Sequence, residues 1–310
     1  MKIFFVLVLL LLLCLFSLET PAQDLRVLTW NTFLIPPPFN STKQNERADL
    51  MAEKLRTIDH DVIFFQEAFL DAKRDLIIKE LAPTYPYFAV PKKGEGFFQF
   101  QDSGLFIVSK YPMKVLDQVI FDDCSGNDCF ASKSAIIVEI DFPDEKKIQM
   151  IDTHLQGWDS VAVRKKQLMQ IKTMMKANAK LGIAQVLVGD LNIDGRIESE
   201  YADSLALMGM TSSPLEGRLN SSNGFSTVGC FETPGGVSEG EWLDHIWLNP
   251  NGTETEIHSK KVVPIVGYLG LQECPLSDHY AVEAFIEVKK NINKVISKGH
   301  NPNIHRVTRS

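Results

Sequence analysis

Short apolar runs alternate with stretches of helical periodicity along this chain, and turn residues separate them. Runs rich in Val, Ile and Phe predict buried strands. We expect strands over 25–31, 62–67, 87–90, 104–109, 115–121, 135–140, 148–154, 186–189, 242–247 and 277–288. Apolar residues at helical spacing predict helices over 46–55, 71–81, 161–175 and 198–208. Residues 211–241 are rich in Gly, Ser, Asn, Thr and Pro, which predicts long loops.

The run Val186–Asn192 carries the clearest candidate chemistry, because an apolar strand ends there on Gly189 and is followed by Asp190 and Asn192. Residues two apart on extended backbone point the same way, so a carboxylate and an amide converge. Oxygen ligands of this kind suit Mg²⁺. Taken alone, the run is equally well explained by an ordinary turn after a strand, since Asp and Asn dominate turns.

The same pattern recurs at other predicted strands, and the repetition is what gives it weight. The polar residues at strand ends or edges are Asn31, Glu67, His154, Asp190 with Asn192, Asp244, and Asp278 with His279. Metal-ligating oxygens together with two histidines suit the metal-assisted hydrolysis of a phosphodiester. The chain has no GxSxG elbow and no GxxxxGK[ST] loop, which argues against a serine hydrolase and a P-loop enzyme.

The charge balance argues against a typical DNA-binding protein, which has a basic footprint. The 310 residues carry a formal net charge of −7. A nuclease with a local basic groove stays possible. The cations on helix 161–175, which are Arg164, Lys165, Lys166 and Lys172, are expected to lie on a solvated face.

Residues 1–22 have the features of a cleaved secretory signal peptide. Lys2 provides the positive start, residues 3–18 are apolar apart from Ser17, and small residues precede Gln23. The apolar core is short for a membrane span, so a retained anchor is the less favoured alternative. We therefore expect a secreted protein with a catalytic domain over 23–288 and a basic, poorly ordered tail over 289–310.

Removing the signal would take Cys14 and leave an even number of cysteines, which suggests disulfides in an exported chain. Three pairings are possible. We favour Cys124–Cys129 with Cys230–Cys274, because the first two share one loop rich in Ser, Gly, Asn and Asp. A zinc site is less favoured, since there is no pair of short CxxC spacings.

The ordered set TWN, QE, THLQ, GDLN, LDHI and SDHY resembles the endonuclease/exonuclease/phosphatase superfamily, over about residues 25–288. Within it, the chain is most similar to the secreted neutral sphingomyelinases. The resemblance implies a deoxyribonuclease-like, four-layer α/β sandwich of two packed mixed β-sheets flanked by helices. It also implies a Mg²⁺-dependent phosphodiesterase, with Mn²⁺ or Co²⁺ as possible substitutes.

The implied reaction is hydrolysis of sphingomyelin to ceramide and phosphocholine at a sphingomyelin-containing membrane surface, with no obligate protein partner and with nucleic acid an unlikely ligand. A secreted nuclease and an inositol-phosphate or other phosphoesterase are the alternatives on the same scaffold. A catalytically inactive binding module is disfavoured, because every expected ligand type is present.

The resemblance also implies roles for individual residues. Glu67 is the expected direct metal ligand, and His279 is the expected general base, oriented by Asp244. His154 is expected to be the acid that assists the leaving alkoxide, or a stabiliser of charge in the transition state. The metal, water and phosphate network is expected to be completed by Asn31, Asp190, Asn192 and Asp278.

Lys133 and Asp128 also fit the pattern of the family, in which the lysine contacts the substrate. A cation there would lie near the phosphate. The alternative is a surface ion pair, which contributes little to stability.

Membrane contact is expected from at least one of two apolar stretches. Bacterial toxins of this group carry a long hairpin with exposed aromatic residues before the SDHY motif, and residues 249–276 do not match it closely. The candidates are Phe97 and Phe98 in one stretch, and Tyr268 and Leu269 in the other. Ordinary core packing is the alternative for both.

Overall fold

The computed structural model describes residues 24–37, 42–94, 101–158, 160–217, 230 and 240–289. The expected signal peptide, nearly all of the expected tail, and Phe97 and Phe98 lie outside these residues. Within the described ranges, no helix combines the length and apolar character that a membrane crossing needs.

The first sheet has the strand order β3-β4-β2-β1-β14-β11-β9. Its strands are β1 (Leu25–Asn31), β2 (Val62–Gln66), β3 (Tyr87–Ala89), β4 (Phe106–Ser109), β9 (Leu215–Glu216), β11 (Glu256–Val263) and β14 (Ala281–Glu287). The pair β1–β2 is parallel and β1–β14 is antiparallel, so the sheet is mixed.

The second sheet has the order β10-β8-β7-β6-β5 and is also mixed, with β7 and β8 parallel. Its strands are β5 (Met113–Ile120), β6 (Ser134–Phe142), β7 (Lys146–His154), β8 (Ala184–Asp190) and β10 (Asp244–Asn249).

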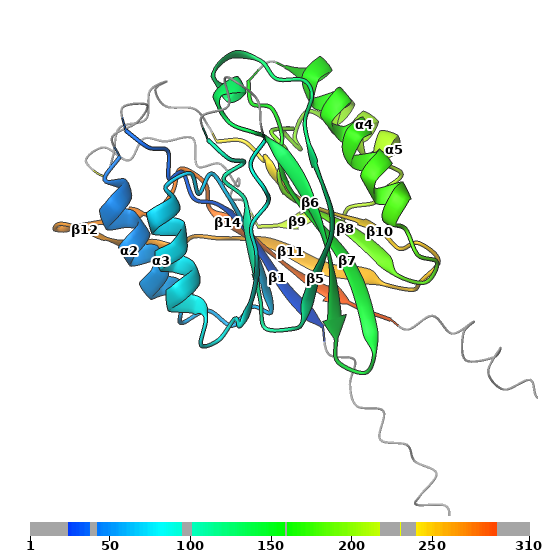
Figure 1. The fold of residues 1–310 in the computed structure, drawn as a ribbon, viewed down its shortest axis with the longest axis horizontal. Helices are drawn as coiled ribbons and strands as arrows, with labels where there is room; N and C mark the ends of the chain where they lie inside the picture. Colours follow the sequence, from blue (N-terminus) through cyan, green and yellow to red (C-terminus); the bar gives the residue numbers. More distant parts are fainter. Residues whose placement is uncertain are drawn as a thin grey trace, which may run out of the picture.

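The two sheets pack face to face around a core to which both contribute, for example Val27 and Phe64 from the first sheet with Val138 and Val186 from the second. Helices α2 (Gln44–Leu55) and α3 (Asp71–Leu81) cover the outer face of the first sheet. Helices α4 (Val161–Asn178) and α5 (Glu198–Met208) cover the second (Figure 1). The predicted four-layer α/β sandwich is confirmed, and most predicted element boundaries shift by only a few residues.

Two sequence-based expectations fail in the region before the final strand. The strand expected to start at residue 277 starts at Ala281, and residues 256–263 form an unpredicted strand, β11. Residues 266–275 form a β-hairpin, which the strand patterning did not predict. Its strands are β12 (Val266–Leu269) and β13 (Gln272–Pro275), and they turn at Gly270, which has φ 74°.

The hairpin is tied to the long-loop region by the disulfide Cys230–Cys274, and the second disulfide, Cys124–Cys129, closes the loop between β5 and β6. Both favoured pairings are therefore confirmed. Tyr268 is 64% exposed, whereas Leu269 is buried at 4%. The expectation that Leu269 contacts a membrane is thus wrong, because its side chain packs beside the Cys230–Cys274 disulfide.

Candidate functional site

The candidate residues meet at the edge where the two sheets come together. Asn31, His154 and Asp190 are the last residues of β1, β7 and β8, while Asp244 is the first residue of β10. The amide of Asn31 donates from Nδ2 to Oδ2 of Asp190 over 2.9 Å, which joins the first sheet to the second. The residues that the sequence pattern selected at strand ends are far apart in the sequence, and the fold places them at one edge.

Acidic groups crowd the centre of this edge. Glu67 follows β2 with φ 55°, and its Oε1 lies 3.8 Å from Nε2 of His154. Its Oε2 is buried and has no hydrogen-bond partner among the residues that the structure describes. Burial and the nearby carboxylate of Asp278 raise the pKa of Glu67 to about 8. Burial also raises the pKa of Asp278, to about 6.

This donor set fits a hard divalent cation. An unpartnered buried carboxylate oxygen and neighbouring acids that resist ionisation both call for positive charge. Among the acidic, histidine and cysteine side chains of the described ranges, one group has its possible ligand atoms close enough together to hold a metal ion. These are Asp190, Asp244 and His279, whose ligand atoms lie within 4.8 Å of one another. Two of these three are already hydrogen-bonded to each other, so the oxygens around Glu67 fit a cation better.

His279 forms that hydrogen bond with a buried carboxylate: its Nδ1 lies 2.7 Å from Oδ2 of Asp244. Its other nitrogen, Nε2, lies 3.8 Å from Oδ2 of Asp190. Burial lowers the pKa of His279, but the carboxylates of Asp244 and Asp190 outweigh it and hold the pKa well above its usual value. The arrangement is that of an imidazole oriented by a carboxylate, with one nitrogen directed at the acidic cluster.

His154 is held in a different electrostatic environment. Its Nε2 lies 3.1 Å from Nζ of Lys133 and 3.5 Å from Oδ2 of Asp190. Burial and then the Lys133 cation lower the pKa of His154 to about 3. His154 is therefore neutral near pH 7, and the positive charge beside it belongs to Lys133.

Lys133 is a buried site residue, so the alternative of a surface ion pair is wrong. Its ammonium group donates to the carbonyl of Leu155 over 2.6 Å and pairs with Oδ2 of Asp128 at 2.9 Å. The same Asp128 oxygen accepts a hydrogen bond from the backbone N–H of Gly157 over 2.8 Å.

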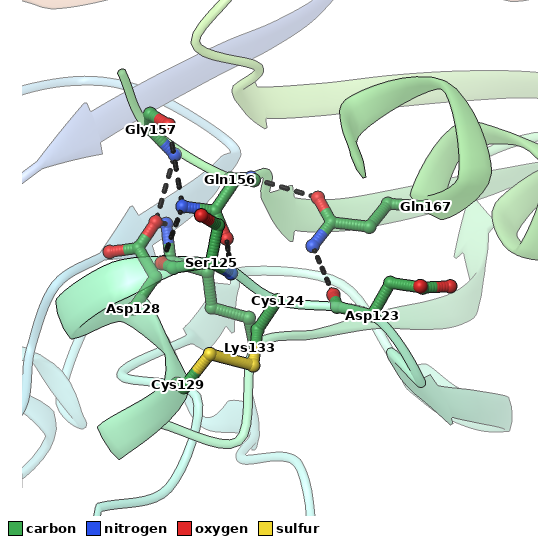
Figure 2. Close-up of a disulfide and its surroundings, with 9 residues drawn as sticks. All are labelled: Asp123, Cys124, Ser125, Asp128, Cys129, Lys133, Gln156, Gly157 and Gln167. Carbon is green, nitrogen blue, oxygen red and sulfur yellow. Dashed lines mark hydrogen bonds and ion pairs between the residues drawn. A yellow bond between two sulfur atoms is a disulfide. The ribbon is translucent and has the colours of Figure 1, made fainter. Parts of the chain in front are cut away.

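The loop that carries Asp128 is fixed to the segment after β7 by further contacts (Figure 2). The side chain of Gln156 accepts from the N–H of Ser125 over 2.8 Å and donates to its carbonyl over 3.0 Å. The Cys124–Cys129 disulfide closes this loop by joining a residue before the short helix η1 (Gly126–Phe130) to a residue within it. Asp128 and Lys133 are thereby held against the segment that follows His154.

Asn192 lies in a turn after a strand and also lies beside the candidate site, so the two sequence-based explanations do not exclude each other. It has φ 49°, and its N–H donates to Oδ1 of Asp190 over 2.9 Å, as in an Asx turn. Its side-chain amide donates to the carbonyl of Leu155 over 3.1 Å, so it also lies beside the Lys133 contact.

Two buried arginines were missed as parts of this site. Arg47 donates to the carbonyls of Thr32 and Leu276 over 3.0 and 2.8 Å, which joins the loop after β1 to the segment before Asp278. Arg164 donates to the carbonyl of Trp158 over 2.6 Å and pairs bidentately with Glu200. The prediction of a solvated face for Arg164 is therefore wrong.

A weak signal for the first was available, because Arg47 stands beside Ala48 on the face of α2 that also carries buried Met51. A cation at such a position is usually buried only with partners.

Comparison with known proteins agrees with this geometry. Residues 28–279 match the profile of the Endonuclease/Exonuclease/phosphatase family. The chain is 24% identical to sphingomyelinase C 2 of Leptospira interrogans over 296 residues, which is 85% of this chain but 46% of that protein. It therefore spans about half the length of that relative.

Two further relatives match over most of their length. Phospholipase C of Staphylococcus aureus is 25% identical over 293 residues, covering 84% of this chain and 87% of that protein. The crystal structure of an S. aureus beta toxin variant with bound magnesium ions superposes with a TM-score of 0.70 at 24% identity, covering 85% and 99% of the two chains.

Proposed function

This chain belongs to the endonuclease/exonuclease/phosphatase family, and from that premise we propose that it is a secreted, divalent-metal-dependent phosphodiesterase that hydrolyses sphingomyelin to ceramide and phosphocholine. One observation carries the proposal: the His279–Asp244 pair faces a cluster of buried acids whose central oxygen, Oε2 of Glu67, has no partner in the described chain. The similarity to sphingomyelinase C and phospholipase C supports the choice of substrate.

Glu67 and Asp278 would hold the cation, with Asn31 and Asp190 completing the network. Mg²⁺ is the proposed ion, and Mn²⁺ or Co²⁺ are proposed as substitutes, because the donors are hard oxygens. When bound, the ion neutralises phosphoryl charge and supplies Lewis acidity. Positive charge there would favour the ionised forms of Glu67 and Asp278, whose pKa values are raised mainly by burial and then by neighbouring carboxylates.

His279 would take the proton of the attacking water at Nε2, since Nδ1 is occupied by Asp244. Asp244 fixes the orientation of the imidazole and stabilises the imidazolium as it forms. Burial lowers the pKa of His279, but the carboxylates of Asp244 and Asp190 outweigh it and raise the pKa, so positive charge at the acidic cluster would favour the neutral imidazole that accepts the proton.

On the other side of the cluster, the neutral His154 and the cationic Lys133 suit the stabilisation of phosphoryl and leaving-group charge. Of the two roles expected for His154, this geometry supports charge stabilisation over a stored proton, because burial and Lys133 both disfavour the imidazolium. Asn192 and Asp128 keep the carbonyl of Leu155 and the ammonium of Lys133 in place.

Access to a lipid substrate would come through the hairpin of β12 and β13. On this hairpin, the side chain of Tyr268 is 64% exposed and that of Leu271 is fully exposed. Shallow insertion of exposed apolar side chains is the expected mode of contact for a protein with net charge −7, which gains no general attraction to anionic lipid. Both disulfides agree with secretion into an oxidising compartment.

The test is incubation of purified protein with sphingomyelin, phosphatidylcholine and plasmid DNA, each with EDTA and with Mg²⁺ restored. We expect ceramide and phosphocholine to appear only when the cation is present. Full activity in chelator would overturn the metal site, and nicking of DNA without lipid hydrolysis would identify a nuclease instead.

A further inference from the structure

Trp158 stands out among the tryptophans because its side chain is 83% exposed, whereas Trp30 and Trp247 are fully buried. It lies four residues after His154, in the segment that crosses the candidate site. Its backbone has φ 62°, a left-handed conformation that costs a bulky residue about 1–2 kcal/mol. An exposed ring on a strained backbone requires an explanation, since exposure of the ring returns nothing to the stability of the fold.

The surrounding structure holds this strained residue firmly. The carbonyl of Trp158 accepts hydrogen bonds from the guanidinium of Arg164 over 2.6 Å and from the N–H of Ser160 over 2.7 Å. Arg164 is buried and is itself fixed by its bidentate pair with Glu200 at 2.8 and 3.0 Å. A buried arginine held by an ion pair thus fixes the backbone of an exposed side chain. This is the arrangement expected of a ligand contact rather than of a mobile loop.

Trp158 lies next to residues of the candidate site. The residue before it, Gly157, lies between two site side chains: a Cβ on Gly157 would be 3.6 Å from Oδ1 of Asn192 and 3.6 Å from Oδ2 of Asp128. Asn192 and Lys133 both donate to the carbonyl of Leu155 in the same segment. The indole therefore projects from the residue next to the groups that would surround a phosphoryl centre.

We propose that the indole of Trp158 binds the quaternary ammonium end of the substrate by a cation–π contact while the phosphate occupies the acidic site. The inference rests on the proposed function and adds to it the residue that selects the headgroup. Trp is the aromatic side chain best suited to a quaternary ammonium, whose diffuse charge is weakly hydrated. The alternative occupant is a membrane interface, which also attracts Trp, and the experiment separates the two.

The experiment compares two water-soluble nitrophenyl phosphodiesters, one of choline and one of its uncharged isostere, in which carbon replaces the quaternary nitrogen. Wild type is expected to prefer the choline ester. Trp158→Ala should lower kcat/KM for the choline ester about 3- to 30-fold, the range of a cation–π contact, and leave the isostere unchanged. Trp158→Phe should fall between the two, because Phe keeps a weaker ring.

Two controls separate a ligand contact from a structural effect. Phe88→Ala removes an aromatic ring that is 59% exposed on β3, at the far edge of the first sheet, and should change neither ester. Inhibition of the choline-ester reaction by phosphocholine should weaken in Trp158→Ala, whereas inhibition by inorganic phosphate should not.

Equal loss on both esters would overturn the proposal, and so would a loss confined to sphingomyelin in liposomes, which would mark Trp158 as a membrane contact. Failure of the proposed function gives a different result, namely wild type that hydrolyses neither ester nor sphingomyelin. Binding of phosphocholine to wild type and to Trp158→Ala, measured by equilibrium dialysis, then decides the headgroup contact directly, and equal binding would overturn it.

Discussion

Replacing Glu67 with Gln should stabilise the metal-free protein while destroying its response to Mg²⁺. The substitution keeps the shape of the side chain and removes its charge. In the folded protein the pKa of Glu67 is raised from 4.5 to about 8, first by burial and then by the carboxylate of Asp278. The folded state therefore keeps a proton that the unfolded chain releases, so the free energy of unfolding falls as pH rises from 4.5 to about 8.

The expected change in the free energy of unfolding follows from this shift in the pKa of Glu67. A rise from 4.5 to about 8 corresponds to about 5 kcal/mol at most. Glu67 shares the repulsion with Asp278, and its side chain is 16% exposed, so about 2–3 kcal/mol is the reasonable expectation. For a domain of this size that is about 5–10 °C in Tm.

Thermal unfolding in EDTA, measured between pH 4.5 and 9, tests this directly. The Tm of Glu67→Gln should match wild type at low pH and exceed it increasingly up to pH 8. In Mg²⁺ at about 100 times its Kd, wild type should gain about 2.7 kcal/mol and the variant should gain little. Hydrolysis by the variant should be lost.

Glu283 provides a matched control, because its pKa is shifted in the opposite direction from that of Glu67. Burial raises the pKa of Glu283, but hydrogen bonds from His60 and Lys261 outweigh it and lower the pKa to about 2. Glu283→Gln should therefore destabilise the protein, and the loss should be complete above pH 4.5 and absent below about pH 2. A Glu67→Gln variant that is less stable than wild type in EDTA at pH 8, or that binds Mg²⁺ equally well, would refute the reasoning.

Three further outcomes are expected. His279→Ala should lower turnover about 10²- to 10⁴-fold, as for a lost general base, and His154→Ala about 10²- to 10³-fold, as for a lost charge-stabilising group. Circular dichroism should be unchanged in both, and near-full turnover in both would remove them from the mechanism. Mass spectrometry of alkylated, exported protein should find no free thiols, whereas four modified cysteines would contradict both disulfides. The double variant Tyr268→Ser with Leu271→Ser should weaken liposome binding and spare a water-soluble phosphocholine ester. Leu181→Ser, which alters a side chain that is 85% exposed beyond α4, should change neither, and an equal loss on both substrates would argue against docking.

Local patterns predicted the site because its residues stand where apolar strands end. Asn31, His154 and Asp190 each follow an apolar run, and the parallel pairs β1–β2 and β7–β8 place such ends at one edge. The assembly of the two sheets into one site came from the family resemblance, because strand patterning does not specify which sheets pack together.

Features that depend on distant backbone groups could not be predicted in this way. Arg47 donates to a carbonyl that precedes it in the sequence and to one that follows it, and the second lies 229 residues away. Strand β11 was missed because it contains the polar run His258–Lys261, which looks like loop sequence until Lys261 is paired with Glu283 on β14. The hairpin was missed as well, since four-residue strands around a Gly270 turn leave only a weak pattern.

The place of β14 in the first sheet makes the proposed site depend on two distant parts of the chain. The strand lies between β1 and β11 and is the last of the described chain, with His279 just before it. Trp30 on β1 donates to the carbonyl of His279 across 249 residues of sequence. During synthesis, Glu67, Asp190 and Asp244 therefore emerge before Asp278 and the proposed general base His279. A chain truncated before β14 is expected to leave β1 and β11 without the strand that pairs with both of them, so the proposed site would not form.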